Sequence, residues 1–467
     1  MKLYNTMSRK AEELKTVKPE SVSFYSCGPT VYDYPHVGNW TGYIYWDVLV
    51  RTLEKSGFSV DWYMNLTDVG HLVSDDDAGE DKLEAGAKRE GKSAWDIAKF
   101  YTEDFKAGLR DLKISVHDDH LVAATDHIKE QIDLIKKLED KGFTYKIEDG
   151  IYFDSTKVTD YGKLARLDIE GLQAGKRVAV ADKKNLTDFA LWKFSAAGSK
   201  RDMEWDSPWG VGFPGWHIEC SAMAMKYLGD TLDIHAGGID HIPVHHTNEI
   251  AQSESATGKT FVNYWLHNNH MMVAEQKISK SLKNGITLQD IKTKGFTPDA
   301  FKLLVLQSHY RTQSNFSWDN LLAAFRRLNR WQAIADLRWQ DNTAEDEDIL
   351  RAVLAKSSAS VLNALQDDLD TPKALVAIEA AMESLSSNLS AKTFEIAKPF
   401  FEAINELFGF ELTSTPDISS EQKALLRERQ EARDSKNWQR ADVIRNDLLQ
   451  QHIEIKDMPH GQVWSRG

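Results

Sequence analysis

The segment from Val22 to Ser56 constrains the fold more than any other part of the chain. Residues 22–26, VSFYS, form an apolar run of strand length, and the following CGPT ends that run with Gly and Pro. The turn YDYPHVGNW then leads into an apolar stretch of helical periodicity, roughly Thr41 to Ser56. A buried strand, a Gly/Pro turn and a helix in this order predict the first βα unit of a parallel sheet, a geometry in which a helix N-terminus meets phosphate.

The α/β pattern breaks off after this region and resumes later. The run VDWYMNLTD predicts the next strand, and the acidic stretch SDDDAGED at 74–81 predicts a surface loop. Residues 115–198 differ in character: KGFTYKIEDGIYFDSTK predicts a β-hairpin that turns at EDG, so we predict an insertion here. A helix at Glu219–Tyr227 and a strand at LDIHA then restore the pattern. The chain is therefore predicted to contain an α/β domain interrupted by an insertion.

From Pro298 onward the sequence is helical in character. Amphipathic segments follow one another with no strand pattern between them, among them FKLLVLQSHY, LLAAFRRLNRWQAIADL and FFEAINELFGF. These segments predict a helical bundle. The polar residues 413–420 predict a linker, and residues 421–467 predict a separate small terminal module.

Composition narrows the class of protein. The chain has 467 residues, which is enough for roughly three domains. The sequence shows no apolar signal segment at its start and no apolar run of about 20 residues, so we predict a cytoplasmic protein with no membrane span. A net charge of −14 argues against nonspecific coating of nucleic acid, but a tRNA-sized partner remains compatible where positive charge is concentrated locally.

The only two cysteines of the chain raise the question of a metal site. Cys27 follows the first predicted strand, and Cys220 lies in GWHIECSAMAMKYLGDTLDIHAGGIDHIPVHHTNE at 215–249. In that segment His245 and Glu249 are four residues apart, which places both on one face of a helix. Two thiolates, an imidazole and a carboxylate are zinc ligands. A disulfide between the cysteines, or two unrelated buried thiols with polar residues on a helix surface, fits the spacing as well.

Further motifs carry a resemblance to a known family. PHVGNW after the first strand and KISKS at 277–281 resemble the paired signatures of class I aminoacyl-tRNA synthetases. CGPTVYDYPHVGN, GWHIECSAMAMKYLG, HHTNEIAQSE and YWLHNNHMMV together resemble the cysteinyl-tRNA synthetase family in particular. The similarity continues through HYRTQSNFS, DDLDTPKAL and KNWQRADVIRNDL, so it covers nearly the whole chain.

The resemblance implies an architecture. It predicts a class I Rossmann-type α/β catalytic domain with an insertion, followed by an all-α helical bundle and a small C-terminal anticodon-binding module. The predicted bounds are 1–114 for the first half of the catalytic domain, 115–198 for the connective insertion, 199–272 for the second half, 273–330 for the KISKS loop and stem-contact region, 331–412 for the bundle, and 421–467 for the anticodon module.

The resemblance also implies an activity, which is ATP-dependent activation of L-cysteine and its transfer to the 3′-terminal adenosine of cysteine tRNA. Cys27, Cys220, His245 and Glu249 match the family's zinc ligands, and in the family this zinc binds the substrate thiolate. Selection through a soft sulfur ligand separates cysteine from serine, a near-isostere that an apolar pocket discriminates poorly. Mg²⁺ accompanies ATP, and we expect a monomer whose partners are ATP, L-cysteine and cysteine tRNA.

Other site residues follow from the family by position. The matches to ATP-binding positions are His36, Gly38, Asn39, Gly237, Gly238, Asp240 and Lys280. The predicted catalytic residues are His36, Asn39, Lys277 and Lys280. The lysines are expected to stabilise negative charge on the departing pyrophosphate.

Two more groups of residues match the family's amino-acid pocket and anticodon contacts. The first group is Gly28, Thr30 and Trp216, and the second is Arg433, Trp438, Asp442 and Asp457. An aromatic face and polar side chains suit unstacked bases. Trp216 and Trp438 also fit the simpler interpretation of aromatic residues in a core.

The sequence departs from the family pattern near the adenosine site. Asn39 stands where the family usually shows histidine, and Ala236 replaces a usual glycine. Ile239 and His241 are unusual neighbours for Asp240. These departures bear on the detail of adenosine binding rather than on the reaction.

Two other classes of protein are alternatives. A ligase that joins cysteine to a small amine acceptor would share the adenylation half but would not need the helical bundle or the terminal module. A non-catalytic tRNA-binding paralogue would be expected to lack phosphate-binding or zinc-binding residues, and His36, Lys280 and the four zinc-ligand positions are all present.

Overall fold

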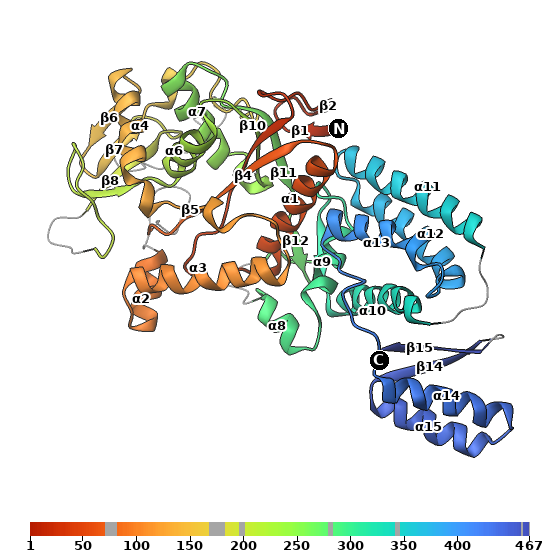
Figure 1. Ribbon diagram of the computed structural model, residues 1–467. Coiled ribbons are helices and arrows are strands. Elements are labelled where there is room, and N and C mark those ends of the chain that lie inside the picture. The colour runs from red at the N-terminus through yellow and green to blue at the C-terminus, as the bar shows by residue number, and fades with distance from the viewer. Residues whose placement is uncertain are drawn as a thin grey trace. The chain divides into compact units, whose positions relative to one another are not determined.

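The computed structural model describes residues 1–70, 82–167, 183–195, 201–278, 284–340, 346–458 and 461–466. The chain divides into two units (Figure 1). Unit 1 comprises Met1–Pro298, Ser308–Phe316 and Asp367–Leu369, and unit 2 comprises Asp299–Gln307, Ser317–Gln366 and Asp370–Gly467. Within the described ranges no helix has the length and apolar character needed to cross a membrane. The predicted acidic loop at 74–81 lies outside these ranges.

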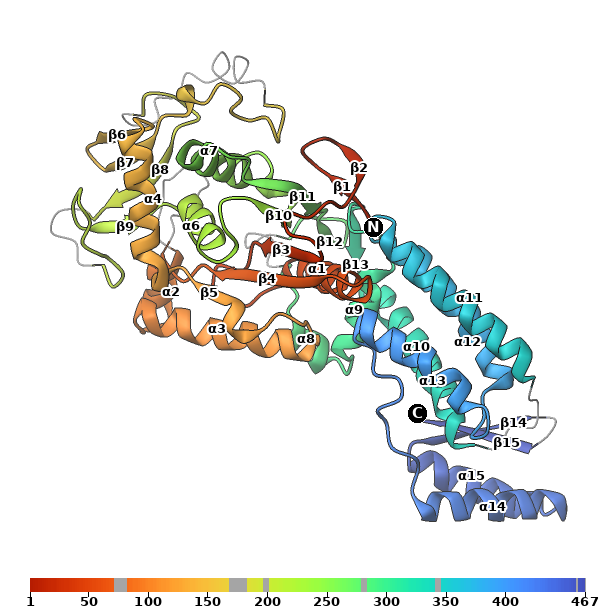
Figure 2. The same cartoon turned by 45° about the horizontal axis from the view of Figure 1, so that its top comes forward.

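Unit 1 is built on a five-stranded parallel sheet in the order β11-β10-β3-β4-β5. Its strands are β3 (Ser21–Ser26), β4 (Ser59–Leu66), β5 (Leu121–Ala123), β10 (Leu232–Gly238) and β11 (Val262–Asn268). The first strand, β3, and the later strand β10 are neighbours, with Ser26 opposite Ala236 (Figure 2). The strand order reverses at this pair, and in such sheets ligands bind outside the carboxyl ends of the strands at that point. The predicted Rossmann-type α/β fold is confirmed.

Helix α1 (Val37–Lys55) begins at a cap that the sequence encodes. The side chain of the N-cap residue His36 accepts a hydrogen bond from the N–H of Asn39, and the side chain of Asn39 accepts one from the N–H of His36. This reciprocal capping box satisfies two backbone donors at the start of the helix. It explains why the helix begins ahead of the predicted Thr41.

The other helices and short strands of unit 1 complete the domain. The helices are α2 (Lys82–Glu90), α3 (Ala94–Asp111), α4 (Ile128–Asp140), α6 (Trp216–Leu228), α7 (His245–Thr257) and α8 (Leu288–Thr293). The short strand pairs are β1 (Lys2–Asn5) with β2 (Lys10–Glu13), and β12 (Met271–Val273) with β13 (Ser314–Phe316). Both α1 and α6 pack on the central sheet, which places the starts of these helices beside the strand ends.

A second, antiparallel sheet lies between the two halves of the central sheet in the sequence. Its strands, in spatial order, are β6 (Thr144–Ile147), β7 (Gly150–Phe153), β8 (Phe189–Phe194) and β9 (Gly212–Pro214). β6 and β7 form the predicted hairpin with its turn at EDG. The sheet differs from the predicted insertion, 115–198, at both ends, because β5 pairs with β4 of the central sheet and β9 lies beyond residue 198. Short strands such as these are defined by their pairing partners, which the local pattern does not reveal.

Unit 2 is helical, as predicted for the region after Pro298, and ends in a β-hairpin. Its helices are α9 (Pro298–Leu306), α10 (Trp318–Ala335), α11 (Glu347–Gln366), α12 (Thr371–Asn388), α13 (Phe394–Phe408), α14 (Ser420–Asp434) and α15 (Trp438–Gln450), and its strands are β14 (Ile453–Met458) and β15 (Gly461–Arg466). The hairpin was not predicted. Its pattern is the alternation of buried Ile453 and Ile455 with exposed residues, which is typical of a half-buried strand.

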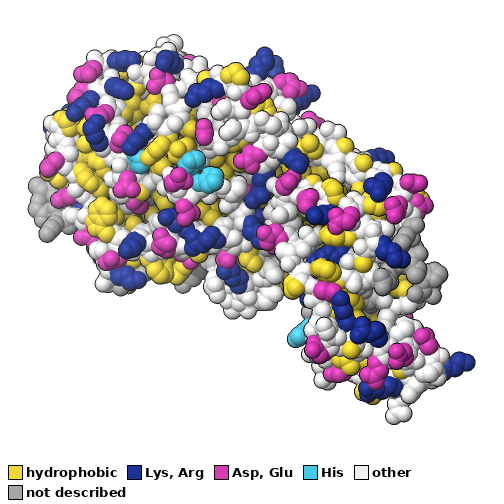
Figure 3. Space-filling model, in the orientation of Figure 1, with side chains coloured by type: hydrophobic (Ala, Val, Ile, Leu, Met, Phe, Trp, Pro, Cys, Tyr) yellow, Lys and Arg dark blue, Asp and Glu magenta, His cyan; other side chains and the backbone are white. Residues whose placement is uncertain are grey.

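The terminal strand β15 is attached to the segment that follows α10. Gln340 makes two hydrogen bonds to the backbone of Trp464, one from its Nε2 to the carbonyl oxygen at 3.0 Å and one to its Oε1 from the N–H at 2.8 Å. Nε of Arg466 donates to Oδ2 of the fully buried Asp336 at 3.0 Å. Acidic and basic side chains are interspersed on the face of the molecule in view (Figure 3).

Candidate active site

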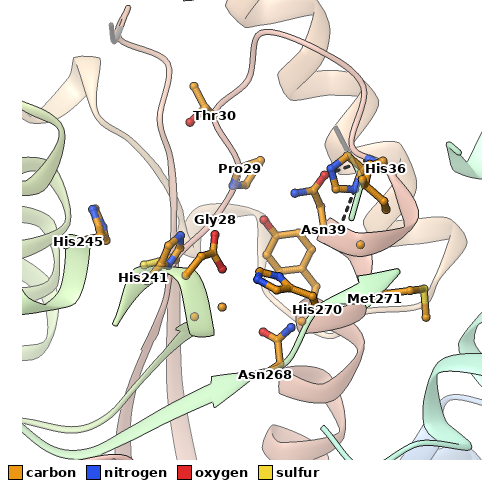
Figure 4. Close-up of a pocket in the computed structure, with 18 of the residues that line it drawn as sticks. Gly28, Pro29, Thr30, His36, Asn39, His241, His245, Asn268, His270 and Met271 are labelled. Atoms are coloured by element: carbon orange, nitrogen blue, oxygen red, sulfur yellow. Dashed lines mark hydrogen bonds between the residues drawn. The ribbon is translucent and has the colours of Figure 1, made fainter. Parts of the chain in front are cut away.

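A cavity of about 420 Å³ lies at the carboxyl ends of β3, β10 and β11. Figure 4 shows residues from these strand ends and from the start of α1 arranged around it. The cavity brings together most of the predicted catalytic-domain residues, namely Cys27, Gly28, Thr30, His36, Gly38, Asn39, Trp216, Cys220, Gly237, Gly238, Asp240, His245 and Lys277. The predicted residue Lys280 lies outside the described residues.

Two glycines are required by close approach in the cavity wall. A Cβ atom at Gly28 would lie 1.8 Å from the backbone oxygen of Asn65, a distance that no side chain could accept without moving the neighbouring strand. A Cβ atom at Gly237 would lie 2.6 Å from Nδ1 of His241. The missing side chain therefore lets the Asn65 backbone approach Gly28 and the His241 ring approach Gly237.

The capping box also orients the predicted phosphate-binding side chains. Nδ1 of His36 accepts from the N–H of Asn39 at 3.3 Å, so the proton of a neutral ring lies on Nε2. Burial lowers the pKa of His36, which keeps the ring neutral near pH 7. Oδ1 of Asn39 accepts from the N–H of His36 at 3.1 Å, and its amide nitrogen is turned away from His36 (Figure 4). Each side chain thus keeps one donor group for a ligand at the helix start.

Cys27, Cys220, His245 and Glu249 form a buried cluster. One potential ligand atom from each of the four lies within 4.8 Å of the others. Both cysteines are free thiols, so the disulfide alternative is wrong. The alternative of unrelated thiols is wrong as well, since the four side chains meet in one place. Cys27, His235, His246 and Glu249 satisfy the same distance criterion and form a second candidate set.

The first set fits a zinc ion by its chemistry. Two sulfurs, an imidazole nitrogen and a carboxylate oxygen are a zinc donor set. Oε1 of Glu249 is buried and, within the described segments, lacks a hydrogen-bond partner of acceptable geometry, although it lies 3.0 Å from Nε2 of His245. A buried carboxylate oxygen without a hydrogen bond is costly unless a cation binds it. The cluster therefore fits a metal ion by both its composition and its unsatisfied charge.

The electrostatics of the cluster favour the anionic forms of Glu249 and Cys220. A hydrogen bond from Cys27 lowers the pKa of Cys220 to about 7, while burial raises that of Cys27. Burial alone would raise the pKa of Glu249, but His235 and His245 outweigh it and lower the value to about 2. Burial would lower the pKa of His245, but Glu249 and Cys220 raise it to about 10. The site thus holds a carboxylate and a readily formed thiolate, both of which bind cations.

A relay of close polar contacts links Cys27 through two histidines to Thr6. Nε2 of His246 lies 3.2 Å from Sγ of Cys27, Nδ1 of His246 lies 2.7 Å from Nε2 of His267, and Nδ1 of His267 lies 2.8 Å from Oγ1 of Thr6. Burial lowers the pKa of both histidines, so the rings are neutral. A metal-bound Cys27 would be a thiolate, which can only accept, so each group in the relay would then donate toward Cys27, starting from the hydroxyl of Thr6. Such outer partners orient metal ligands.

Two more histidines contact the other ligands. Nε2 of His235 lies 2.9 Å from Oε2 of Glu249, and Nδ1 of His217 lies 2.9 Å from Nδ1 of His245. Sequence reasoning missed the supporting roles of these histidines and of the relay. The available signal was the number of histidines within the site motifs HIEC, DIHAGG, HHTNE and WLHNNH, but only the fold shows which of them touch.

The remaining predicted residues line other parts of the cavity. The ring of Trp216 lies 4.5 Å, centroid to centroid, from that of His245, so Trp216 walls the cavity beside the metal cluster. Oδ1 of Asp240 lies over Gly238, 2.3 Å from where a Cβ would stand. Lys277 is exposed and lines the cavity at the end that holds His36 and Asn39.

The predicted anticodon residues lie in unit 2. Nη1 of Arg433 donates to Oδ2 of Asp457 at 2.8 Å, and Arg429 binds the same carboxylate through two nitrogens, which lowers the pKa of Asp457. Trp438 is 56% exposed, so the interpretation as a core aromatic is wrong. The guanidinium of Arg433 lies 5.8 Å from its ring centroid. Asp442 is exposed on α15, the helix that begins at Trp438.

Comparison with known proteins agrees with this geometry. The model of the tRNA synthetases class I (C) catalytic domain matches residues 13–326, and the model of the cysteinyl-tRNA ligase anticodon binding domain matches residues 415–464. Among solved structures, Mycobacterium tuberculosis methionyl-tRNA synthetase bound by methionyl-adenylate is similar in fold, with a TM-score of 0.57 and 14% identity over 84% of this chain and 88% of that one. The sheet order, the capped signature and the family model define a class I aminoacyl-tRNA synthetase.

Curated relatives narrow the class to a family. Cysteine–tRNA ligase 1 of Burkholderia lata is 44% identical over 98% of this chain and 96% of its own length. The cysteine–tRNA ligases of Treponema denticola and Thermococcus gammatolerans are 39% and 38% identical, each over 100% of this chain and 99% of their own length. The chain belongs to the cysteine–tRNA ligase family, as the sequence motifs predicted.

Proposed function

We propose that this chain activates L-cysteine with ATP and transfers it to the 3′-terminal adenosine of cysteine tRNA. The observation that carries the proposal is that a sulfur-rich metal cluster and a capped helix start line the same cavity. Cys27, Cys220 and His245 line one end of it, and His36 and Asn39 line the other. A thiol-selecting centre facing a phosphate-binding helix N-terminus suits the joining of a thiol amino acid to a nucleotide.

Amino-acid selection would reside at the metal cluster. Cys27, Cys220, His245 and Glu249 would hold one zinc ion per chain, which when bound supplies a soft Lewis acid for the substrate thiolate. A serine hydroxyl stays protonated and is a harder ligand, so serine binds weakly although its shape is nearly the same. Trp216, beside His245, closes the side of the pocket.

Activation is an in-line attack of the cysteine carboxylate on the α-phosphorus of ATP, and the bond to pyrophosphate breaks. Nε2–H of His36 and the amide N–H of Asn39 would donate to phosphate oxygens at the start of α1. Lys277, and Lys280 on the KISKS loop, would stabilise negative charge on the departing pyrophosphate. ATP is expected to bring Mg²⁺ without a dedicated protein cage.

Transfer follows when a hydroxyl of the terminal adenosine attacks the adenylate carbonyl and AMP leaves. No enzyme nucleophile is required, because positioning and charge stabilisation lower the barrier. Unit 2 would read the anticodon: exposed Trp438 offers a stacking face, and Arg433, Asp442 and Asp457 offer polar contacts. The expected monomeric state and cytoplasmic location stay predictions.

The two alternatives fit less well. A ligase for small amine acceptors has no use for residues 415–464, which match an anticodon binding domain. A non-catalytic paralogue has no need to keep the phosphate-binding signature and the metal cluster in one cavity, as this chain does.

Two assays on the purified full chain test the proposal. We expect cysteine-dependent exchange of pyrophosphate into ATP, with serine a far weaker substrate, and charging of cysteine tRNA. His36→Ala provides an inactive control that leaves the metal cluster intact. Exchange without charging would support the small-acceptor ligase, and absence of both with a zinc-loaded, folded protein would support the non-catalytic paralogue.

A further inference from the structure

His241 is a cavity residue whose role the predicted mechanism leaves open. It ends the short 3-10 turn Ile239–His241 that follows β10, at the point where the sheet order reverses. Its ring lines the cavity beside the metal cluster, 5.1 Å from the ring of His245 and 6.2 Å from that of Trp216, centroid to centroid. Figure 4 shows His241 on the His245 side of the cavity, away from His36 and Asn39.

The two nitrogens of His241 lie in different surroundings. Nδ1 is buried, has no hydrogen-bond partner among the residues that the structure describes, and packs over Gly237. Nε2 is not enclosed in this way, and within the described part of the chain no residue forms a hydrogen bond with it. The ring therefore presents one polar edge to the cavity and hides the other against the backbone of β10.

The tautomer follows from this asymmetry. An unpaired buried N–H is less tolerable than an unpaired buried acceptor. The proton of the neutral ring therefore belongs on Nε2, and His241 offers the cavity an N–H donor without a charge.

His241 is not suited to a place in the metal centre itself. In the part of the chain that the structure describes, its nitrogens are not in either set of ligand atoms that meet within 4.8 Å. Its hydrogen-bond donor faces the space next to the cluster, where the body of a metal-bound thiol compound would lie. Among the groups of such a compound a carboxylate is the strongest acceptor for this N–H, because hydrogen bonds to ionised groups are stronger than those between neutral groups.

We propose that Nε2–H of His241 hydrogen-bonds to the α-carboxylate of the bound amino acid and thereby sets amino-acid affinity. The inference rests on the proposed function, in which the thiolate of that amino acid binds at Cys27, Cys220, His245 and Glu249. The ammonium group has an acidic partner available, since Asp240 adjoins His241 and lines the same cavity. The carboxylate, in contrast, needs a donor, and the cavity-facing N–H of His241 provides one beside the metal cluster.

The same contact would matter in both steps of the reaction. Before activation it holds the carboxylate toward the phosphate end of the cavity, where His36 and Asn39 lie. After activation the carbonyl oxygen of the adenylate replaces a carboxylate oxygen as the acceptor. A neutral donor suits both states, because it does not bind the free carboxylate so strongly that its attack on phosphorus is suppressed.

Two thiol probes separate the ends of the amino acid. 3-Mercaptopropionate carries the thiol and the carboxylate, and cysteamine carries the thiol and the amine. Their dissociation constants for the zinc-loaded protein, measured without ATP, report binding independently of catalysis. For His241→Leu we expect 3-mercaptopropionate to bind about ten- to a hundredfold more weakly, the effect of losing one hydrogen bond to a charged group, while cysteamine binds as to the parent.

Two matched variants identify the nitrogen involved. The amide nitrogen of glutamine reaches the place of Nε2, and that of asparagine reaches the place of Nδ1. We therefore expect His241→Gln to restore binding of 3-mercaptopropionate to within a few-fold of the parent and His241→Asn not to restore it. Pyrophosphate exchange should show the same order in KM for cysteine, with KM for ATP and zinc content unchanged.

Several outcomes would overturn the inference. Equal loss of both probes in His241→Leu would mean that the ring only shapes the pocket, and loss of cysteamine alone would assign His241 to the amine. Unchanged binding of both probes would leave His241 without a ligand contact. Failure of the proposed function would look different, since the parent itself would then show no cysteine-dependent exchange.

Discussion

Asn39 tests whether the start of α1 contributes to the chemistry or only shapes the turn. Its Oδ1 accepts from the N–H of His36 at 3.1 Å, which fixes the amide and leaves its N–H groups for the cavity. Asn39→Ala removes both functions. Asn39→Asp retains an oxygen that can accept from His36 but replaces the cavity-facing donor with a negatively charged oxygen. The pair therefore separates helix capping from phosphate binding.

The two functions have different magnitudes. Loss of a helix-capping side chain costs about 0.5–2 kcal/mol of stability. Loss of a donor to charge that develops in the transition state costs about 2.7–4 kcal/mol, or roughly a hundred- to a thousandfold in kcat. Asn39→Asp avoids most of the first cost, but it adds repulsion between the carboxylate and the phosphates. We expect Asn39→Ala to be the less stable variant and Asn39→Asp to be the less active one.

Thermal unfolding measures the order of the variants in stability, and cysteine-dependent pyrophosphate exchange measures their order in activity. Asn39→His, which restores the residue usual in the family, should keep much of the activity because an imidazole can both accept from His36 and donate to phosphate. The reasoning fails if Asn39→Asp exchanges pyrophosphate as fast as the parent. It also fails if the activities of the variants simply follow their stabilities, because Asn39 would then be only a turn former.

Other regions of the structure yield further predictions. Cys220→Ala should lower zinc, measured by elemental analysis, from one ion per chain to well below one and abolish activation of cysteine without creating activation of serine. Burial raises the pKa of Asp68 to about 6, above the value of about 3.9 expected in the unfolded chain. Because the unfolded state then releases its proton first, the parent should lose stability as the pH rises from about 4 to about 6. The unfolding temperature of Asp68→Asn minus that of the parent should therefore be larger at pH 8 than at pH 4. Arg466→Ala should cost about 1–2 kcal/mol in denaturant unfolding, because buried Asp336 loses one of its partners but keeps Arg338. Trp438→Ala should weaken tRNA binding by about 1–3 kcal/mol, while Trp438→Phe, which retains a stacking face, should keep most of the affinity and pyrophosphate exchange should be unchanged in both.

The sequence could predict the parts of the fold that local pattern encodes. The first βα unit, the hairpin at EDG and the helical region after Pro298 all follow from periodicity and turn residues. The short strands β5 and β9 could not be assigned in this way, because each is only three residues long and is defined by its neighbour in a sheet. The hairpin β14–β15 has the alternation of a strand but lies in a module whose other residues are helical.

The site shows the same division between local pattern and fold. The pair of His245 and Glu249 can be read from helical spacing, but its meeting with Cys27 depends on β3 lying beside β10. In the sequence analysis, the grouping of Cys27 with His245 and Glu249 came from motif similarity rather than from a physical argument. The relay from Thr6 through His267 and His246 to Cys27 joins residues up to 261 positions apart, and no local pattern indicates it. Hydrogen bonds of this kind become visible only when the strands are in place.

The contacts of His246 and His235, together with the cavity lining, bear on the choice between the two candidate metal sets. His246 contacts Cys27 and His235 contacts Glu249, each through Nε2, so each of these histidines already supports a candidate ligand. Neither of them lines the cavity, whereas Cys220 and His245 do. A substrate thiolate can reach a metal only from the cavity, so under the proposed function we assign the ion to Cys220 and His245 together with Cys27 and Glu249. His235 and His246 of the second set then support the first set, because they orient Cys27 and Glu249 rather than forming another site.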